Sequence, residues 1–357
     1  MVERSADDPV PPDLIRPAGT DRLDVNRLST WMRDHVKGFA GPVSYSKFSG
    51  GQSNPTYRLD VPGGSYVLRR KPFGPVLPSA HAVDREFRVT TALHRAGFPV
   101  PRPHALCEDE TVIGSAFYVM EMVEGRSLSD GTMPGVAPVE RAAHYHAMVD
   151  TLAALHGVDH HAAGLAGYGR PGNYFGRQVA RWTRQYQAAE TEHIPAVERL
   201  IEWLPRTVPD QTGVSVVHGD YRIDNLIFAP GAPHVAAVLD WELSTIGDPL
   251  ADLSYFLMSW VTPPAGHSGV MGATGPENGT PTMAETVGRY CAATGREDLP
   301  NLQWHFAYNL FRLTAITQGI KKRVELGTAS SNQAHETAAR VGALADTAWE
   351  FARDAGA

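Results

Sequence analysis

The sequence predicts an α+β fold in two lobes, a small N-terminal sheet with one main helix followed by a larger, mostly helical part. Two observations predict it. Short runs of β-type residues separated by turn signals recur between residues 45 and 122, interrupted by one helical pattern at 82–96. After Gly125 the apolar residues follow the helical period of 3.6, except for two apolar runs that bracket a polar loop between 214 and 239.

The N-terminal part begins with residues 1–20, which are rich in proline and charge and which we expect to be a flexible arm. A helical pattern follows at 24–36 and stops at Gly38. The predicted strands share aromatic or β-branched residues and flanking turn residues, and they lie at 45–48, 57–61, 65–69, 105–107 and 116–122. We assign residues 21–124 to the N-terminal lobe.

The C-terminal lobe, residues 125–357, is predicted to be mainly helical. Its helical patterns lie at 139–156, 178–189, 193–204, 302–326 and 331–355. Asp248 followed by Pro249 is typical of another helix start, because aspartate caps the first turn and proline is well accommodated within that turn. The stretch 260–283 is rich in Gly, Pro and Thr, and its length indicates a lid or a substrate-binding loop.

Composition argues against several classes of protein. The 357 residues are 43% hydrophobic and 20% charged, as in ordinary globular proteins. The net charge of −7 argues against nucleic acid or an anionic membrane as a partner, because both attract concentrated lysine and arginine. Two cysteines are too few for a disulfide framework and fit a reducing cytoplasm. The N-terminus does not look like a signal peptide, and no apolar run reaches the about 18 residues of a membrane helix.

The strongest chemical signal lies between the two apolar runs. The first run leads into His218-Gly219-Asp220-Tyr221-Arg222-Ile223-Asp224-Asn225, and the second ends in Asp240-Trp241-Glu242. An aspartate and an asparagine five residues apart, followed by a second aspartate after the next strand, are the groups that phosphoryl transfer needs. One carboxylate orients the attacking hydroxyl, while a side-chain amide and a second carboxylate hold Mg²⁺ against the phosphates.

With these motifs the sequence resembles the aminoglycoside phosphotransferase superfamily, which is distantly similar to protein kinases and to choline kinase. Within it, the sequence is most similar to the branch found fused to, or encoded near, acyl-CoA dehydrogenases. The segments that carry this similarity, besides Asp240 to Ser244, are residues 50–57, 67–72, 80–86 and 247–253. The resemblance covers about residues 22 to 350 and implies a bilobal, protein-kinase-like fold.

The resemblance also implies roles for the motif residues. Asp220 is implied to be the catalytic base or hydroxyl orienter, and Asn225 and Asp240 are implied to be the metal ligands. Glu242 stands at a position where protein kinases carry glycine, and it either reaches a second metal ion or its water shell or has a structural role. His218 is implied to be a scaffold residue.

Two further residues of this region have implied or inferred roles. Arg222 lies two residues after Asp220, where protein kinases have a lysine that reaches the γ-phosphate. An arginine here either stabilises charge on the transferring phosphoryl group or pairs with a nearby acid such as Asp224. The resemblance implies that Asp248 braces the backbone of the catalytic loop.

The expected nucleotide site lies in the N-terminal lobe. Gly50, Gly51, Ser53 and Asn54 lie between two β-type runs, where glycine lets backbone amides approach phosphate oxygens. The segment is weak evidence alone, since most Gly-Gly pairs in hairpins are only turns. The position of this segment strengthens the interpretation, because an apolar strand that ends in a cation follows it in the chain.

That cation is Arg69, which the resemblance places where kinases keep the lysine that binds the α- and β-phosphates. Glu86 on the next helix is implied to pair with it. Arginine for lysine is a departure from the kinase pattern, since a planar guanidinium and an ammonium are not interchangeable. Glu121 and Met122 are implied to present their backbone to the adenine. The expected cofactors are ATP and Mg²⁺.

The acceptor is predicted less directly. From residue 251 onward ten acids stand against eight bases, which does not favour a polycation such as an aminoglycoside. The aromatic residues at 304–311 and the basic run 321–323 suit an amphiphilic acceptor with an anionic end, such as a hydroxyacyl-CoA. We therefore expect a cytoplasmic small-molecule kinase, monomer or homodimer, acting on a metabolite hydroxyl without nucleic acid or membrane partners. The alternatives are an antibiotic kinase and a non-catalytic nucleotide-binding regulator.

Overall fold

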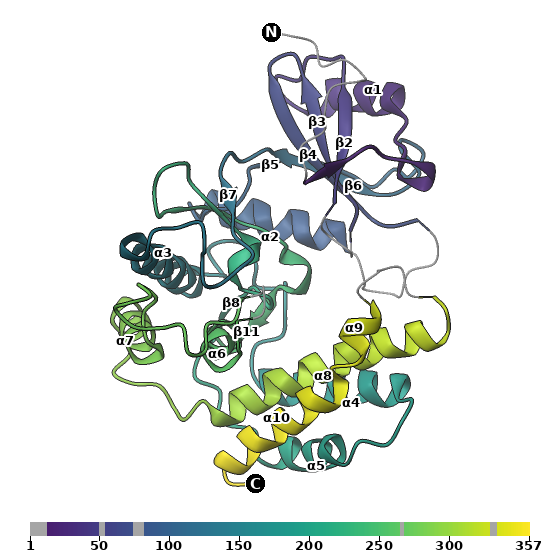
Figure 1. The fold of residues 1–357 in the computed structure, drawn as a ribbon. Coiled ribbons are helices and arrows are strands. Elements are labelled where there is room, and N and C mark those ends of the chain that lie inside the picture. The colour runs from purple at the N-terminus through teal and green to yellow at the C-terminus, as the bar shows by residue number, and fades with distance from the viewer. Residues whose placement is uncertain (1–12, 50–53, 74–81, 265–267, 329–333) are drawn as a thin grey trace. The chain divides into compact units, whose positions relative to one another are not determined.

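The computed structural model describes residues 13–49, 54–73, 82–264, 268–328 and 334–357 (Figure 1). The chain divides into two compact units. Unit 1 comprises residues 1–126, 227–232 and 236–243, and unit 2 comprises residues 127–226, 233–235 and 244–357. Two segments from the second half of the chain therefore belong to the N-terminal unit, which a single boundary at residue 124 does not include.

Unit 1 is built on a six-stranded antiparallel sheet in the order β1-β2-β3-β4-β6-β5. The strands are β1 (Leu14–Ile15), β2 (Ser44–Phe48), β3 (Thr56–Val61), β4 (Gly64–Arg70), β5 (Pro103–Cys107) and β6 (Phe117–Glu121). The last five agree with the predicted strands to within two residues. The strand β1 corrects the expectation of a flexible arm through residue 20, because it pairs with β2 and buries Leu14.

Helices cover both faces of this sheet. Successive side chains of a strand point to opposite faces, so β6 contributes to two separate clusters. Phe117 and Val119 pack with residues of α1 (Val25–His35), whereas Tyr118 packs with the first residue of α2 (Val83–Arg95). The same alternation on β4 matters for the site, because it sends neighbouring arginines to different faces.

Arg70 lies on the α1 face and Arg69 lies on the α2 face. The Arg70 guanidinium is buried and donates to the Tyr57 hydroxyl and to the carbonyl of Thr20. Arg69 instead reaches Glu86 on α2. The strand period therefore selects Arg69, and not its neighbour, for the face that carries the candidate nucleotide site.

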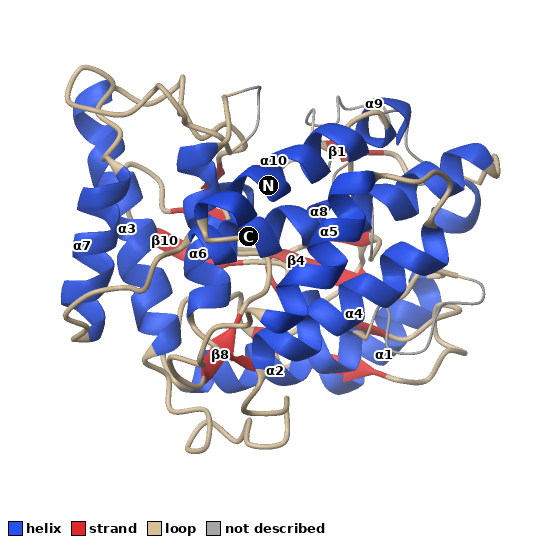
Figure 2. Ribbon diagram, turned by 90° about the horizontal axis from the view of Figure 1, so that it is seen from below, coloured by secondary structure: helices blue, strands red, loops and turns tan. Residues whose placement is uncertain are grey.

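Unit 2 is mainly helical (Figure 2). Its helices are α3 (Pro138–His156), α4 (Tyr174–Ala189), α5 (Pro195–Trp203), α6 (Leu250–Val261), α7 (Met283–Thr294), α8 (Gln303–Glu325), α9 (Ala334–Ala338) and α10 (Val341–Asp354). The long helix α8 packs against α4, α6 and α10, and α10 also packs against α5. The C-terminal helix predicted at 331–355 is in fact the two helices α9 and α10.

Short strands position the two motif loops. β8 (Ser215–Val217) pairs with β11 (Thr245–Gly247) and leads into residues 218–225. The boundary between the units passes through the strands β7 (Arg126–Ser127), β9 (Leu226–Phe228) and β10 (Val235–Val238). The loop with Asp220 consequently belongs to unit 2, and the loop with Asp240 belongs to unit 1.

The region 260–283 is held to α6 in its described part. The Trp260 indole donates to the carbonyl of Pro281, and the amide of Val270 donates to the carbonyl of Ser259. A role as a lid or substrate loop stays a prediction. In the part of the chain that the structure covers, none of the helices has the length and apolar character required to cross a membrane.

Candidate active site

The loop between β8 and β9 carries the string from His218 to Asn225. Gly219 has a φ of +86°, a left-handed value that a side chain would strain, and this explains a glycine between the histidine and the aspartate. Asp252 on α6 anchors this loop, because its carboxylate accepts the backbone amides of His218 at 2.6 Å and Gly219 at 2.7 Å. Asp252 is fully buried, so both bonds tie the loop to the core of unit 2.

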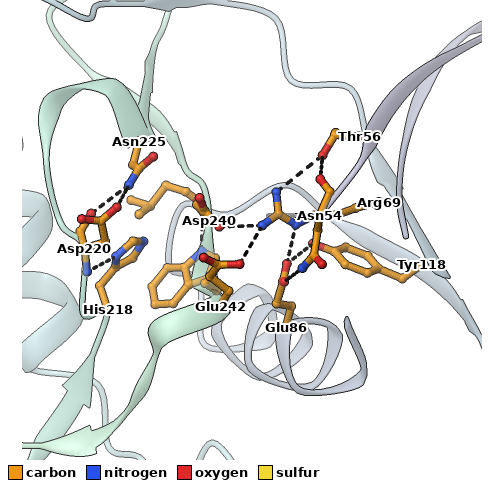
Figure 3. Close-up of polar contacts among 12 residues, drawn as sticks. Asn54, Thr56, Arg69, Glu86, Tyr118, His218, Asp220, Asn225, Asp240 and Glu242 are labelled. Carbon is orange, nitrogen blue, oxygen red and sulfur yellow. Dashed lines mark hydrogen bonds and ion pairs between the residues drawn. The ribbon is translucent and has the colours of Figure 1, made fainter. Parts of the chain in front are cut away.

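The Asp220 carboxylate is oriented by its own loop (Figure 3). The Asn225 Nδ2 donates to Asp220 Oδ2 at 3.0 Å and to the Asp220 carbonyl at 2.8 Å. The backbone amide of Asp220 donates to Nδ1 of His218 at 3.1 Å, which agrees with a scaffold role for the histidine. The Asp220 side chain remains 22% exposed, so the carboxylate is fixed and still accessible to a ligand.

Arg222 lies between two acids of the same loop. Its Nη2 is 2.9 Å from Asp224, and its Nε is 3.4 Å from Asp220. Burial alone would lower the pKa of Arg222, but the negative charge of Asp220 and then of the neighbouring groups raises it. The contact with Asp224 is the acid pairing considered above, and the guanidinium also adjoins the Asp220 carboxylate.

The second motif loop follows β10 in unit 1. Asp240 has a φ of +62°, a strained conformation that aspartate tolerates better than most residues and that clusters at functional sites. Trp241 anchors it, because its ring is buried edge-on against Phe98 and its indole donates to the carbonyl of Val238 at 3.0 Å. The anchored tryptophan therefore holds the aspartate in its unusual backbone conformation.

Arg69 joins three carboxylates of unit 1 (Figure 3). Its Nε is 2.8 Å from Glu86, and its Nη2 is 2.6 Å from Asp240 and 3.8 Å from Glu242. Burial alone would lower the pKa of this guanidinium, but Glu86 and Asp240 raise it well above its ordinary value. The fork of an arginine contacts Glu86 and Asp240 at once, which the single ammonium of a lysine cannot do with the same geometry.

Glu86 is held by two more donors. Asn54 Nδ2 donates to one carboxylate oxygen at 2.7 Å, and the Tyr118 hydroxyl donates to the other at 3.1 Å. Asn54 and Glu86 are both buried. The side chain of Asn54 thus supports Glu86, and the predicted contact of Asn54 with a nucleotide stays a prediction.

The other predicted nucleotide residues are only partly placed. Gly50, Gly51 and Ser53 lie outside the described residues. Glu121 ends β6, where its amide donates to the carbonyl of Arg102, and Met122 follows as a half-buried residue. Their contact with adenine stays a prediction.

The predicted metal ligands have the right chemistry for magnesium. Asn225, Asp240 and Glu242 offer amide and carboxylate oxygens, the ligands that Mg²⁺ prefers. In unit 1 the carboxylates of Asp240 and Glu242 both point to one nitrogen of Arg69, so they converge. In unit 2 the Asn225 nitrogen is used by Asp220, which leaves the amide oxygen as the atom for a metal. The donor types therefore fit the predicted ion.

The residue that holds the loop 218–225 differs from the one predicted from the sequence. Asp248, expected in that role, binds the amide and hydroxyl of Thr212 and caps α6 through the amide of Leu250. Asp252 holds the loop instead, and His156 Nε2 lies 3.5 Å from its carboxylate. The available signal was that Asp252 lies one helical turn after Asp248, on the first turn of a helix where a carboxylate can face inward.

Most of the aromatic and basic residues that were expected to bind an acceptor contact other parts of the protein. Trp304, Phe306, Tyr308 and Phe311 are buried in the core between α8 and its neighbours. In the basic run, Lys321 pairs with Glu192 and Lys322 donates to the carbonyl of Ala188. The aromatic residues therefore serve helix packing, whereas Lys321 and Lys322 are half-buried and Arg323 is exposed.

The fold described above is shared with solved phosphotransferases. A crystal structure of a Ralstonia eutropha JMP134 protein, provisionally named an aminoglycoside phosphotransferase, is 48% identical with a TM-score of 0.85, covering 93% of this chain and 99% of that one. Aminoglycoside phosphotransferase APH(4)-Ia shares the fold at 16% identity, with a TM-score of 0.61 and coverage of 93% and 100%. These similarities confirm the predicted α+β, protein-kinase-like fold.

The chain belongs to the phosphotransferase enzyme family, whose model matches residues 44–288. Among curated relatives, acyl-CoA dehydrogenase family member 10 of Mus musculus is 45% identical over 88% of this chain and 30% of that protein. Acyl-CoA dehydrogenase family member 11 of Homo sapiens is 41% identical over 96% of this chain and 44% of that protein. The chain spans less than half the length of these relatives. The predicted superfamily and branch are confirmed, and the protein is a phosphotransferase.

Loss of the Arg69 cation is expected to destabilise the fold of unit 1. Arg69→Met leaves Glu86, whose side chain is 1% exposed, without its counter-ion, so we expect the free energy of unfolding to fall by about 3 kcal/mol. Arg69→Lys restores the charge but not the fork and is expected to cost about 1 kcal/mol. Urea unfolding measures both.

The matched control is Arg58→Met in the neighbouring strand. Arg58 pairs with Asp60, and both side chains are about a quarter exposed, so the loss is expected to stay below about 1 kcal/mol. Equal destabilisation by Arg58→Met and Arg69→Met would contradict the importance of the buried cluster.

Proposed function

We propose that this phosphotransferase moves the γ-phosphoryl group of ATP, bound with Mg²⁺, to the hydroxyl of a small metabolite. The observation that carries the proposal is the Asp220 carboxylate, which is accessible, held by Asn225, and placed on a loop that Asp252 anchors in the core. A carboxylate fixed in this way is suited to orient a hydroxyl and to accept its proton late in the transfer.

The nucleotide is proposed to bind to unit 1. The proposed contacts are Arg69 and the backbone around Gly50, Gly51 and Ser53 for the phosphates, and the backbone of Glu121 and Met122 for the adenine. Arg69 is suited to this role because it already holds a carboxylate, Asp240, on the α2 face of the sheet. Structures of APH(4)-Ia contain ADP or AMP-PNP together with hygromycin B, which supports a nucleotide donor.

Asn225, Asp240 and Glu242 are the proposed metal ligands. A bound magnesium ion would neutralise phosphate charge during the transfer. The protein's own part is to present oxygen donors on rigid loops, and the buried Trp241 and the hydrogen bond from Asn225 to Asp220 provide that rigidity. Arg222 is proposed to stabilise negative charge on the phosphoryl group as it moves toward the hydroxyl.

A hydroxyacyl-CoA is the acceptor that we propose. The support is the identity of 41–45% to proteins named as acyl-CoA dehydrogenase family members, in which this kind of chain accompanies much additional sequence. A kinase joined to an acyl-CoA dehydrogenase is suited to a substrate of the same chemical class. The buried aromatic residues of α8 do not add to this support, because they lie in the core.

An aminoglycoside is the alternative acceptor. The similarity to a Ralstonia eutropha protein provisionally named an aminoglycoside phosphotransferase favours it. The ten acids and eight bases from residue 251 onward speak against it, since a polycation needs a clear excess of carboxylates.

The initial rate of ADP formation tests the proposal. Mg-ATP is supplied with a panel of 4-hydroxyacyl-CoAs, choline, homoserine, several sugars and kanamycin, with Asp220→Asn as the blank. A rise in rate with a hydroxyacyl-CoA that the variant abolishes supports the proposal. A rise only with kanamycin supports the alternative, and tight ATP binding without any acceptor-dependent turnover supports a regulator.

Removal of Arg222 is expected to affect turnover much more than nucleotide binding. Its guanidinium adjoins Asp220, so Arg222→Ala is expected to lower kcat by about a hundredfold while the ATP dissociation constant changes less than about threefold. Asp224→Asn removes only the acid partner and is expected to change kcat by less than about fivefold. An unchanged kcat in Arg222→Ala would show that the arginine only pairs with Asp224.

A further inference from the structure

Two side chains next to Asp220 have no part in the function proposed above. Tyr255 lies on α6 and Arg312 lies on α8, so both come from helices and not from the catalytic loop. Both side chains lie near the Asp220 carboxylate. Tyr255 and Arg312 are therefore candidates for residues that fix its orientation.

Tyr255 lies beside Asp220, and its side chain interacts with the Asp220 carboxylate. Burial, followed by the negative charge of Asp220, raises the pKa of Tyr255, so the phenol keeps its proton beside the carboxylate. Asn225 donates to only one oxygen of this carboxylate, so a phenol on a neighbouring helix can further limit the rotation of the Asp220 side chain.

Arg312 lies behind this contact. The residue is 6% exposed, and its Nη2 donates to the carbonyl of Gly219 at 2.6 Å. Its guanidinium carbon is 5.0 Å from the centre of the Tyr255 ring, within the range of a cation–π contact. The Nε atom is buried and has no hydrogen-bond partner among the described residues.

Burying a guanidinium with an unpaired nitrogen costs free energy of folding, so the buried position of Arg312 requires an explanation. Arg312 contacts the Tyr255 ring and the carbonyl of Gly219, the residue before Asp220. The negative charge of Asp220 also acts on it. Arg312 therefore acts on the catalytic aspartate both through the backbone, at the Gly219 carbonyl, and through a side chain, the ring of Tyr255.

We propose that Tyr255 and Arg312 are positioning residues that fix the Asp220 carboxylate for the attacking hydroxyl. Tyr255 acts through its hydroxyl, and Arg312 acts through the Tyr255 ring and the Gly219 carbonyl. The inference rests on the proposed function, because it concerns the orientation of the group that the function assigns to the hydroxyl.

The kinetic test compares Tyr255→Phe with Tyr308→Phe. Tyr308 is a buried tyrosine of α8 that stacks on Trp304, which makes it a control for the loss of a buried hydroxyl. Turnover is measured with the acceptor found in the panel, or as ATP hydrolysis in water. Tyr255→Phe is expected to lower kcat about tenfold with the KM for ATP within about twofold, and Tyr308→Phe to leave both within about twofold.

The same substitution is then made in the Asp220→Asn background. A residue that acts through Asp220 loses its effect there, whereas a merely structural residue keeps it. Arg312→Met is expected to behave like Tyr255→Phe, and Arg312→Lys is expected to recover part of the loss because it retains the charge. An equal effect of Tyr255→Phe in both backgrounds would overturn the proposal.

Crystal structures of the variants test the inference without any turnover. In Tyr255→Phe and Arg312→Met the Asp220 side chain is expected to rotate or to lose its bond with Asn225, while in Tyr308→Phe it stays in place. If Asp220 keeps the same position in Tyr255→Phe, the positioning role is refuted, whether or not the protein transfers phosphate. If Arg312→Met does not fold, the structure of Tyr255→Phe alone decides whether the positioning role holds.

Discussion

Asp220→Asn is expected to lower kcat by about a thousandfold, whichever acceptor the panel identifies. The asparagine keeps the size of the side chain, but it cannot accept the hydroxyl proton, and its amide offers one oxygen where the carboxylate offers two. Asn225 would still find an acceptor in the backbone carbonyl of residue 220, so the loop is expected to keep its shape. Steady-state ADP release measures the loss.

Nucleotide affinity is the companion measurement for Asp220→Asn. The residues proposed to hold the nucleotide belong to unit 1, and the substitution lies in unit 2, so the dissociation constant of ATP is expected to stay within about twofold. Asp224→Asn is the matched control, since it removes a carboxylate of the same loop that pairs with Arg222. A residual kcat above about a tenth of wild type in Asp220→Asn would show that another group orients the hydroxyl.

Most of the fold follows from local patterns in the sequence. The strands β2 to β6 alternate and are bounded by turn residues, and α3, α4 and α8 show a helical period, so their ends fall close to the predicted ones. The helix α7 was missed although Thr282 and Glu285 form a capping box, because the surrounding Gly and Pro residues suggested a loop. The two-residue strand β1 was missed because so short a run has no period of its own.

The candidate site shows where sequence reasoning ends. The string from His218 to Asn225 predicts its own chemistry, because its residues are local and their spacing is informative. The sequence could not show that Arg69 contacts Asp240, 171 residues away, or that Arg312 contacts Gly219 and the Tyr255 ring. These contacts depend on how helices and strands pack, and single residues on apolar helices carry no signal of their tertiary partners.

Asp252→Asn is expected to reduce both stability and turnover. The carboxylate is completely buried and accepts the amides of His218 and Gly219, and charge-assisted bonds of this kind are stronger than neutral ones. An asparagine would turn one hydrogen-bond donor toward these amides or leave one of them without an acceptor. We expect the free energy of unfolding to fall by about 3 kcal/mol and kcat to fall by about tenfold or more, because the catalytic loop loses its anchor.

The pH dependence of stability provides a second measurement on Asp252. Burial alone would raise the pKa of Asp252, but the hydrogen bond from His156 and the charge of the nearby histidines hold it below its ordinary value of 3.8. A carboxylate with a lowered pKa stabilises the fold fully above its unfolded pKa and loses this contribution as the pH falls through the folded pKa. The stability difference between wild type and Asp252→Asn is therefore expected to shrink as the pH falls below about 4.

Asp248→Asn separates the anchor from simple burial of an aspartate. Asp248 is also fully buried on the same segment, but its carboxylate binds Thr212 and the amide of Leu250, which lie outside the catalytic loop. It is expected to cost a similar amount of stability while kcat changes less than about threefold. If the two variants lower kcat equally, the loop does not depend on Asp252 for its shape. If only Asp252→Asn lowers kcat, the hydrogen bonds from the amides of His218 and Gly219 to this carboxylate are what keep Asp220 in its active position.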